Sequence, residues 1–232
     1  MSERGRRDSM TTSAKQAILQ RLRMKQPSFD TPSQPVDIDN PTWPMAARIA
    51  HFKSMLESVR AEVHVVDPEN WTDSLKSLLA DKQINNLLYA KQGPLALGIE
   101  AAWGDTLLPE LVCDERPVDE WKEEIFFHTD AAVTSARAAI AETGSLILWP
   151  DEFEPRTWSL VPPVHFVVVD SEKLYNNFAE AVEAEEWAQQ MPTNALLISG
   201  PSKSADIQQT LAYGVHGPTE LIVLLQSTIQ PN

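Results

Sequence analysis

The residues best suited to chemistry lie in the last quarter of this chain. An apolar run at 196–198 leads into small and hydroxyl-bearing residues, and a glycine-rich stretch at 214–218 carries a histidine. A strand that runs into a tight turn and then into a helix presents backbone N–H groups to an anion. We therefore predict a site for a phosphate, a carboxylate or an oxyanion, formed by Ser199, Gly200, Pro201, Ser202, Lys203, Ser204 and Gly217.

Two further residues of this region have alternative roles. Asp206 would lie in the first turn of the expected helix, where a carboxylate interacts favourably with the helix N-terminus, so capping competes with ligand contact. His216 could direct its imidazole at the same site, which makes it a candidate for proton transfer. A structural histidine with satisfied hydrogen bonds is the alternative.

Alternating helices and strands from residue 45 onward must position these candidates. Continuous apolar strands such as 166–169 are typical of a parallel sheet covered on both faces, so we expect a three-layer α/β/α sandwich. Residues 130–145 stay open, since their alanines favour a helix and Thr143-Gly144-Ser145 favours a turn. Elsewhere, periodicity predicts helices over 45–60, 71–80 and 172–190, a helical turn over 119–124, and strands over 62–66, 86–89, 107–112, 145–149, 164–170, 195–199 and 220–225.

We expect two parts, residues 1–44 and residues 45–232. In the first part, apolar positions at helical spacing predict a basic amphipathic helix over 12–24, and five prolines indicate an extended connector over 27–44. This helix could pack on its own domain or on a twin subunit, or it could bind a different protein. The second part is the expected α/β domain.

Composition narrows the classes of partner and site. The net charge is −14, although seven of the 19 Lys and Arg residues lie in the first 25 positions, and so acidic a body disfavours nucleic acid as a partner. The single cysteine, Cys113, cannot form an internal disulfide, and we expect it to be a semi-buried, inert thiol in a reducing cytoplasm. We predict no membrane span and no metal site, because no apolar run is long enough and the histidines lack ligand spacing.

Four blocks of the chain, taken together, resemble one family. They are 140–145, 160–165, 199–207 and 214–218, and their order and spacing are similar to those of the lactate-utilization (LUD) domain family, in particular its lactate-utilization protein C branch. The resemblance implies a fold similar to that of sugar-phosphate isomerases and CoA transferases. It also implies an accessory subunit beside two iron–sulfur proteins that oxidise L-lactate to pyruvate, with the clusters in those partners and no cofactor bound by this chain.

The resemblance adds the 140–145 block to the candidate site. In the family a similar stretch lies along a ligand cleft, which implies ligand contacts for Thr143, Gly144 and Ser145 and makes Glu142 a candidate acid/base or nucleophile. Glu142 could instead only shape the loop by accepting hydrogen bonds from it. Departures from the family pattern are Lys203 and Ser204, where arginine and threonine are expected, and Ser135 and Arg137, where glycine and a residue that is not basic are expected.

Two other functions stay open. The chain could be a free-standing enzyme of the acyl-transfer or isomerase type that acts on a small carboxylate or phosphate, or it could be a ligand sensor. The acidic loop 151–154, flanked by Trp149 and Trp158, could cover the cleft or face a partner.

Overall fold

The computed structural model describes residues 14, 16–21, 42–104, 107–114, 116, 118–205, 211–214 and 216–230. The chain divides into two compact units, Met1–Asp39 and Asn40–Asn232. Residues 14 and 16–21 of the first unit are helical, and they lie within the helix predicted over 12–24. Among the helices of the described residues, none combines the length and the apolar character needed to cross a bilayer.

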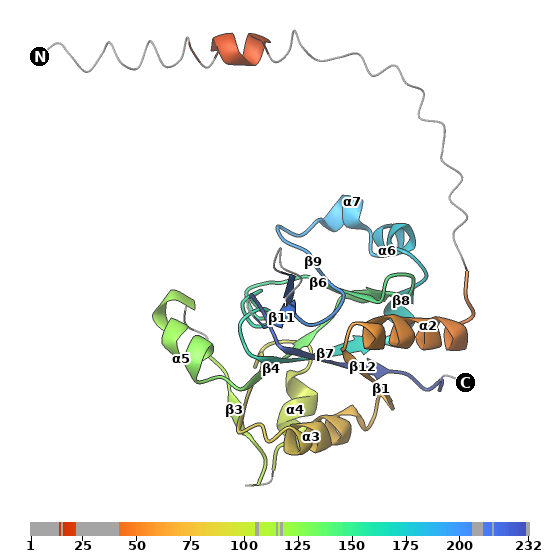
Figure 1. Ribbon diagram of the computed structural model, residues 1–232, viewed down its shortest axis with the longest axis vertical. Coiled ribbons are helices and arrows are strands. Elements are labelled where there is room, and N and C mark those ends of the chain that lie inside the picture. Colours follow the sequence, from red (N-terminus) through yellow and green to blue (C-terminus); the bar gives the residue numbers. More distant parts are fainter. Residues whose placement is uncertain are drawn as a thin grey trace, which may run out of the picture. The chain divides into compact units, whose positions relative to one another are not determined.

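A six-stranded sheet forms the centre of the second unit, and each pair of neighbouring strands in it is parallel (Figure 1). This arrangement agrees with the buried apolar strands that the sequence predicts. In the order β1-β12-β7-β4-β2-β3, the strands are Glu62–Val66, Glu220–Gln226, Val164–Asp170, Ala131–Ser135, Asn86–Leu88 and Glu110–Val112.

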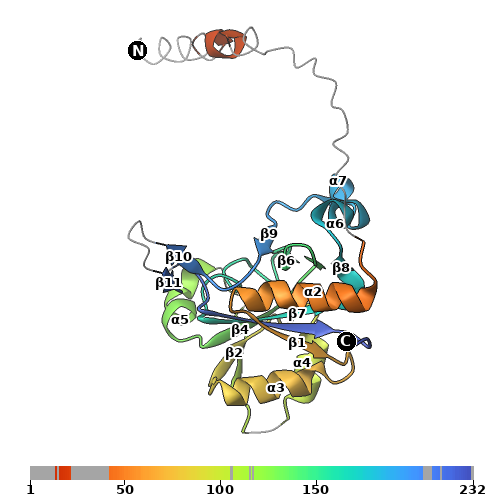
Figure 2. The same cartoon turned by 45° about the vertical axis from the view of Figure 1, so that its right-hand side comes forward.

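Helices cover both faces of this sheet, so the expected α/β class with a mainly parallel central sheet between helices is confirmed. The helix α2, Met45–Ser58, lies on one face, and α3, Trp71–Asp81, lies with α4, Ala96–Ala102, on the other (Figures 1 and 2). A smaller sheet shares the face of α2. Its order is β8-β5-β6-β9, with bounds Leu174–Tyr175, Ala138–Ile140, Ser145–Leu148 and Leu196–Ile198.

The remaining elements are short. A 3-10 turn, η1 at Val118–Glu120, precedes α5 at Lys122–Phe127, whose Ile125 packs with Trp121 and Trp158 against the β2 and β4 side of the sheet. Residues 130–145, which the sequence left open, form β4, β5 and a turn. Pairing with neighbouring strands therefore overrides the helical propensity of the alanines.

The long helix predicted over 172–190 is wrong. The segment contains a 3-10 turn, a two-residue strand and two short helices: η2 at Ser171–Lys173, β8, α6 at Phe178–Ala184 and α7 at Trp187–Gln190. Leu174 and Tyr175 pair with β5, and the Asn177 side chain then accepts a hydrogen bond from the Glu180 N–H and caps a new helix. Glu186, with φ +50°, separates α6 from α7.

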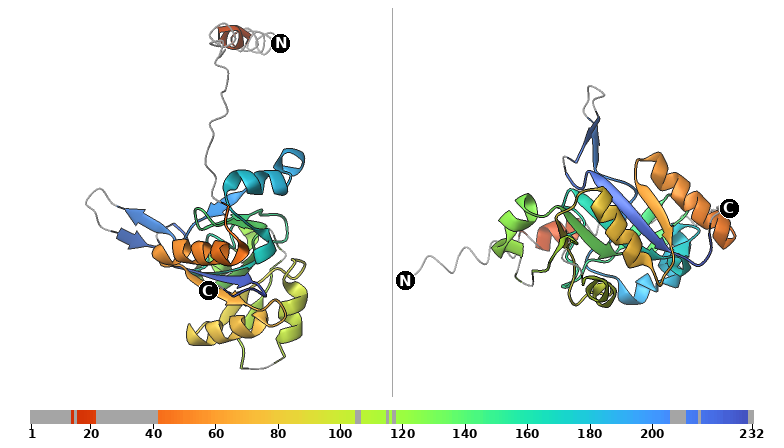
Figure 3. Two further views of the ribbon diagram at one scale, coloured as in Figure 1. Left: turned by 90° about the vertical axis from the view of Figure 1, so that its right-hand side faces the viewer. Right: turned by 90° about the horizontal axis from the view of Figure 1, so that it is seen from below.

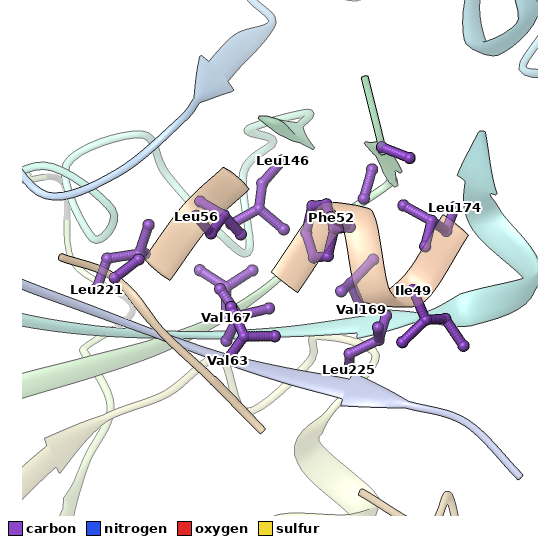
Figure 4. Close-up of a cluster of buried hydrophobic side chains, with 14 of the residues drawn as sticks. Ile49, Phe52, Leu56, Val63, Leu146, Val167, Val169, Leu174, Leu221 and Leu225 are labelled. Atoms are coloured by element: carbon purple, nitrogen blue, oxygen red, sulfur yellow. The ribbon is translucent and has the colours of Figure 1, made fainter. Parts of the chain in front are cut away.

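The core that holds α2 in place is built from one face of that helix. Ile49, Phe52 and Leu56 are fully buried and point toward side chains of β7, β12 and the smaller sheet (Figure 4). Their spacing of three and four residues places them on one side of the helix. The position of α2 is therefore fixed by apolar contacts with both sheets.

Replacing Phe52 by alanine should lower the free energy of unfolding by about 3–5 kcal/mol, because the large cavity would lie between two sheets. Urea unfolding followed by circular dichroism measures the change. Leu97→Ala in α4 is the control, since Leu97 is 85% exposed and its truncation should change the stability by less than about 0.5 kcal/mol. Equal losses in the two variants would contradict this account of the core.

Candidate functional site

A pocket of about 250 Å³ brings together the two motifs of the last quarter of the chain. It lies at the amino ends of β7 and β12, beside the end of β9. The Ser202 N–H donates to the Pro218 carbonyl at 2.8 Å, which ties the first motif to the second. Of the predicted site residues, the pocket is lined by Ser199, Gly200, Pro201, Ser202, His216 and Gly217.

The helix expected after Ser202 is not formed at residues 203–205. Instead β10, Lys203–Ala205, pairs in antiparallel fashion with β11, Leu211–Tyr213, and this hairpin stands away from the central sheet (Figures 2 and 3). The expected helix start at these residues is therefore wrong, and the anion site predicted here stays a prediction. Asp206 lies outside the described residues, the side chain of Ser204 is also not described, and Lys203 is exposed outside the pocket lining.

A chain of hydroxyl groups joins the 140–145 block to the pocket. The Oγ1 of Thr143 lies 2.7 Å from the Oγ of Ser145, which lies 2.7 Å from the Oγ of Ser199. Each hydroxyl can donate or accept, so the chain can reverse its direction. Ser199 can therefore present either a donor or an acceptor to a ligand in the pocket.

Two glycines allow the site loops to approach α2. Gly144 has φ +60°, and a Cβ atom there would lie 2.7 Å from the Cβ of Met55. Gly200 has φ +144°, and a Cβ atom there would lie 2.8 Å from the Cγ2 of Val59. Both φ values are rare for residues with side chains, and a Cβ atom would clash at both positions. Glycine is therefore required at each of them for its backbone conformation and for its small size.

Glu142 lies on the turn beside the pocket but outside its lining. Glu142 is exposed, and its backbone N–H donates a hydrogen bond to the Asn176 carbonyl at 3.0 Å. His216, by contrast, is exposed and lines the pocket. The catalytic roles of Glu142 and His216 stay predictions.

His165, the second residue of β7, also lines this pocket. It is fully buried, and its Nε2 lies 2.9 Å from the Oγ1 of Thr134. The Nδ1 atom is buried and has no hydrogen-bond partner among the described residues. Burial lowers the pKa of His165 to about 3, so the ring is neutral, with one nitrogen that donates and one that accepts. In the sequence, the position of this histidine inside the apolar run 164–169 is the signal that could have marked it as a functional residue.

The structure also bears on Cys113 and on possible metal ligands, which lie outside the pocket. Cys113 is exposed, so the expectation of a semi-buried thiol is wrong. Within the described ranges, no group of three or more His, Cys, Asp or Glu side chains is arranged to hold a metal ion.

Comparison with known proteins gives the family of the chain. The model of the LUD domain family matches residues 49–226. This chain belongs to the LUD domain family. The resemblance of the four sequence blocks is therefore confirmed, and all four overlap the matched range.

Named relatives extend this result. An uncharacterized protein of Neisseria meningitidis serogroup B is 43% identical over 181 residues, which is 76% of each chain. Lactate utilization protein C of Macrococcus caseolyticus is 27% identical over 71% of this chain and 74% of its own. The crystal structure of a DUF162 family protein from Deinococcus radiodurans has a TM-score of 0.60 and 21% identity over 80% of this chain and 100% of its own, which supports the fold.

The chemistry available in this pocket of the LUD domain is binding through neutral polar groups. Ser199, Ser202 and His165 supply hydroxyl and imidazole groups, and His216 lies at the exposed side. A volume of about 250 Å³ is below the usual range for drug-sized ligands, so the ligand should have few atoms.

Gly144→Ala should destabilise the LUD domain by about 1–3 kcal/mol, because φ is positive and the new Cβ would meet the side chain of Met55 and the backbone of α2. Thermal unfolding measures the loss. Gly104→Ala is the control, since no atom lies within 4 Å of a Cβ placed there. A Gly144→Ala protein as stable as the control would show that α2 can move away from the turn.

His165 should make the domain less stable in acid. Because its pKa of about 3 in the folded state is below the ordinary value of 6.5, the unfolded chain binds a proton between these pH values and the folded chain does not. Stability from this group is complete above pH 6.5 and falls as the pH decreases, by up to about 1.4 kcal/mol per pH unit. Urea unfolding from pH 7 to pH 4.5 should show a shallower slope for His165→Gln, whereas His128→Gln on the exposed end of α5 should keep the slope of the original protein.

Proposed function

We propose that this chain serves lactate utilization as an accessory subunit of a three-component system that oxidises L-lactate to pyruvate. The observation that carries the proposal is the family match over 49–226, together with relatives named lactate utilization protein C that align over most of their length. In this proposal the chain binds a small anionic ligand, or a partner surface, through the pocket of Ser199, Ser202 and His216.

The polar groups of the pocket support a small hydroxy acid or oxo acid as the ligand. L-lactate has one carboxylate and one hydroxyl, and both can exchange hydrogen bonds with serine hydroxyls. His165 adds a neutral imidazole to the lining of the pocket, and its buried Nδ1 has no hydrogen-bond partner among the described residues. Its neutrality matters because a protonated imidazole at full burial would carry a large desolvation penalty.

His216 is placed to exchange protons at the open side of the same pocket. Oxidation of a hydroxyl to a carbonyl releases protons, and an exposed imidazole can transfer one to solvent. The electrons would pass to the iron–sulfur clusters of two partner subunits. The part of this chain is to bind the acid, to orient it through Ser199 and Ser202, and to accept a proton at His216.

The test is reconstitution of L-lactate-dependent reduction of an artificial electron acceptor by the two cluster-bearing partners, with and without this chain. We expect the rate to require the chain. His216→Ala and Ser199→Ala should lower it by about tenfold or more, since each removes a group that contacts the acid or its proton.

One control variant makes the result specific, and two outcomes would contradict the proposal. His128→Ala also removes an exposed histidine, but at the end of α5 and outside the pocket, so it should leave the rate unchanged. A rate that does not depend on the chain would refute the accessory role. Turnover of a small carboxylate or phosphate by the isolated chain, abolished by Glu142→Gln, would instead identify a free-standing enzyme.

A further inference from the structure

A second pocket of about 490 Å³ lies at the carboxyl ends of β4 and β7. Ser135, the last residue of β4, lines it together with Arg137 just after that strand, and Lys173 lines it from η2, which follows β7. Glu154 lines the pocket from the acidic loop 151–154, and Trp149 lines it from just before that loop. Crevices outside the carboxyl ends of parallel strands are the usual ligand sites of open α/β sheets. The residues that line this pocket differ from those that line the pocket of Ser199 and His216.

One wall of this pocket carries two cations that share a single buried carboxylate. Glu185 accepts hydrogen bonds from the Arg137 Nε at 2.5 Å, the Lys173 Nζ at 2.8 Å and the Tyr175 hydroxyl at 2.6 Å. Burial alone would raise the pKa of Glu185, but the bonds from Lys173 and Tyr175 and the charge of Arg137 outweigh it and lower the pKa. Two positive charges against one negative charge leave one positive charge in excess.

The cations are held in place and are still accessible. The Arg137 guanidinium lies 4.8 Å from the ring centroid of Trp149, and Trp149 in turn packs its ring against Trp187. The side chains of Arg137 and Lys173 are 41% and 49% exposed. A ligand in the pocket can therefore reach charges whose orientation is already fixed, which lowers the entropy lost on binding.

The same pocket is lined by a carboxyl group, that of Glu154, which can be neutral near pH 7. The N–H and the hydroxyl of Ser135 donate to the Oε2 of Glu154 at 3.0 and 2.7 Å. Burial raises the pKa of Glu154 to about 7, against the effect of these two bonds and with a smaller contribution from the charge of Asp151. The charged groups that share a pocket lining with it are Asp151 of its own loop, Arg156 two residues further along the chain and, from the other elements, Arg137 and Lys173.

We propose that this second pocket binds a small, singly charged carboxylate, which pairs with Arg137 and Lys173 and meets Glu154 in the same lining. Beside Glu185, Arg137 and Lys173 leave one positive charge that can pair with one carboxylate, whereas Asp151 in the same lining adds a negative charge. A second negative charge on the ligand would be repelled by Asp151, which lines the same pocket. The inference does not rest on the proposed function, because it concerns a different pocket and a different set of residues.

The experiment is a titration of the full chain at pH 6.5 with pyruvate and, for comparison, with doubly charged succinate. The affinity is measured by calorimetry, and the site is identified from the indole N–H resonance of Trp149, assigned with a Trp149→Phe protein. We expect pyruvate to move this resonance and to bind more tightly than succinate. Arg137→Gln should weaken pyruvate binding by about tenfold or more, since it removes a charge-assisted hydrogen bond.

A matched control and a second variant keep the test decisive. Lys76→Gln removes a cation paired with Asp73 on α3, outside the lining of this pocket, and should leave the affinity unchanged. If Arg137→Gln does not fold, as judged by its NMR spectrum, Lys173→Met takes its place with the same expected loss. Absence of pyruvate binding at tens of millimolar would overturn the proposal, as would binding that leaves the Trp149 resonance in place.

Glu154 offers an independent readout. As the pH rises from 6 to 8 the carboxyl group ionises, so pyruvate should bind progressively more weakly. Glu154→Gln keeps an acceptor for Ser135 but does not ionise, and its pyruvate affinity should stay nearly constant over this range. An unchanged pH dependence in Glu154→Gln would overturn the assignment of Glu154 to this pocket.

Discussion

The close approach of α2 to two glycine turns is the constraint on which the candidate site depends. α2 is fixed by the burial of Ile49, Phe52 and Leu56 between two sheets, and its C-terminal end then lies against the turns of Gly144 and Gly200. A side chain at either glycine would meet atoms of α2 or of Val59. Apolar packing in the core thus sets the positions of the hydroxyl groups that follow these turns, because Ser145 comes directly after one turn and Ser199 directly before the other.

The two pockets of this acidic chain differ in the charge of the groups that line them. The pocket at the amino ends of β7 and β12 relies on neutral groups, and full burial keeps His165 uncharged. The pocket at the carboxyl ends of β4 and β7 has charged walls, in which Glu185 holds Arg137 and Lys173 together. With a net charge of −14 for the whole chain, such local cations are what an anion would need.

Strand pairing outweighs local preference in two segments for which the sequence predicts a helix. Residues 203–205 follow a turn and were expected to start a helix, but they pair with 211–213 in a hairpin. Leu174 and Tyr175 fall within a stretch of helical periodicity, but they complete the edge of the smaller sheet beside β5. In both cases the hydrogen bonds go to segments that are distant in sequence or beyond a turn, and periodicity within one segment cannot reveal them.

The sequence by itself determined the α/β class, the buried parallel strands, the family and the two motifs that line the first pocket. These follow from local signals: continuous apolar runs such as 166–169, and glycine- and serine-rich turns at fixed spacing. Only the tertiary structure decided that His165 faces a pocket, that Glu142 lies outside its lining, and that Arg137 meets Glu185 from 48 residues away. The physical reason is that burial and charge pairing depend on which distant segments the sheets bring together, and that information is not contained in the spacing of residues along one element.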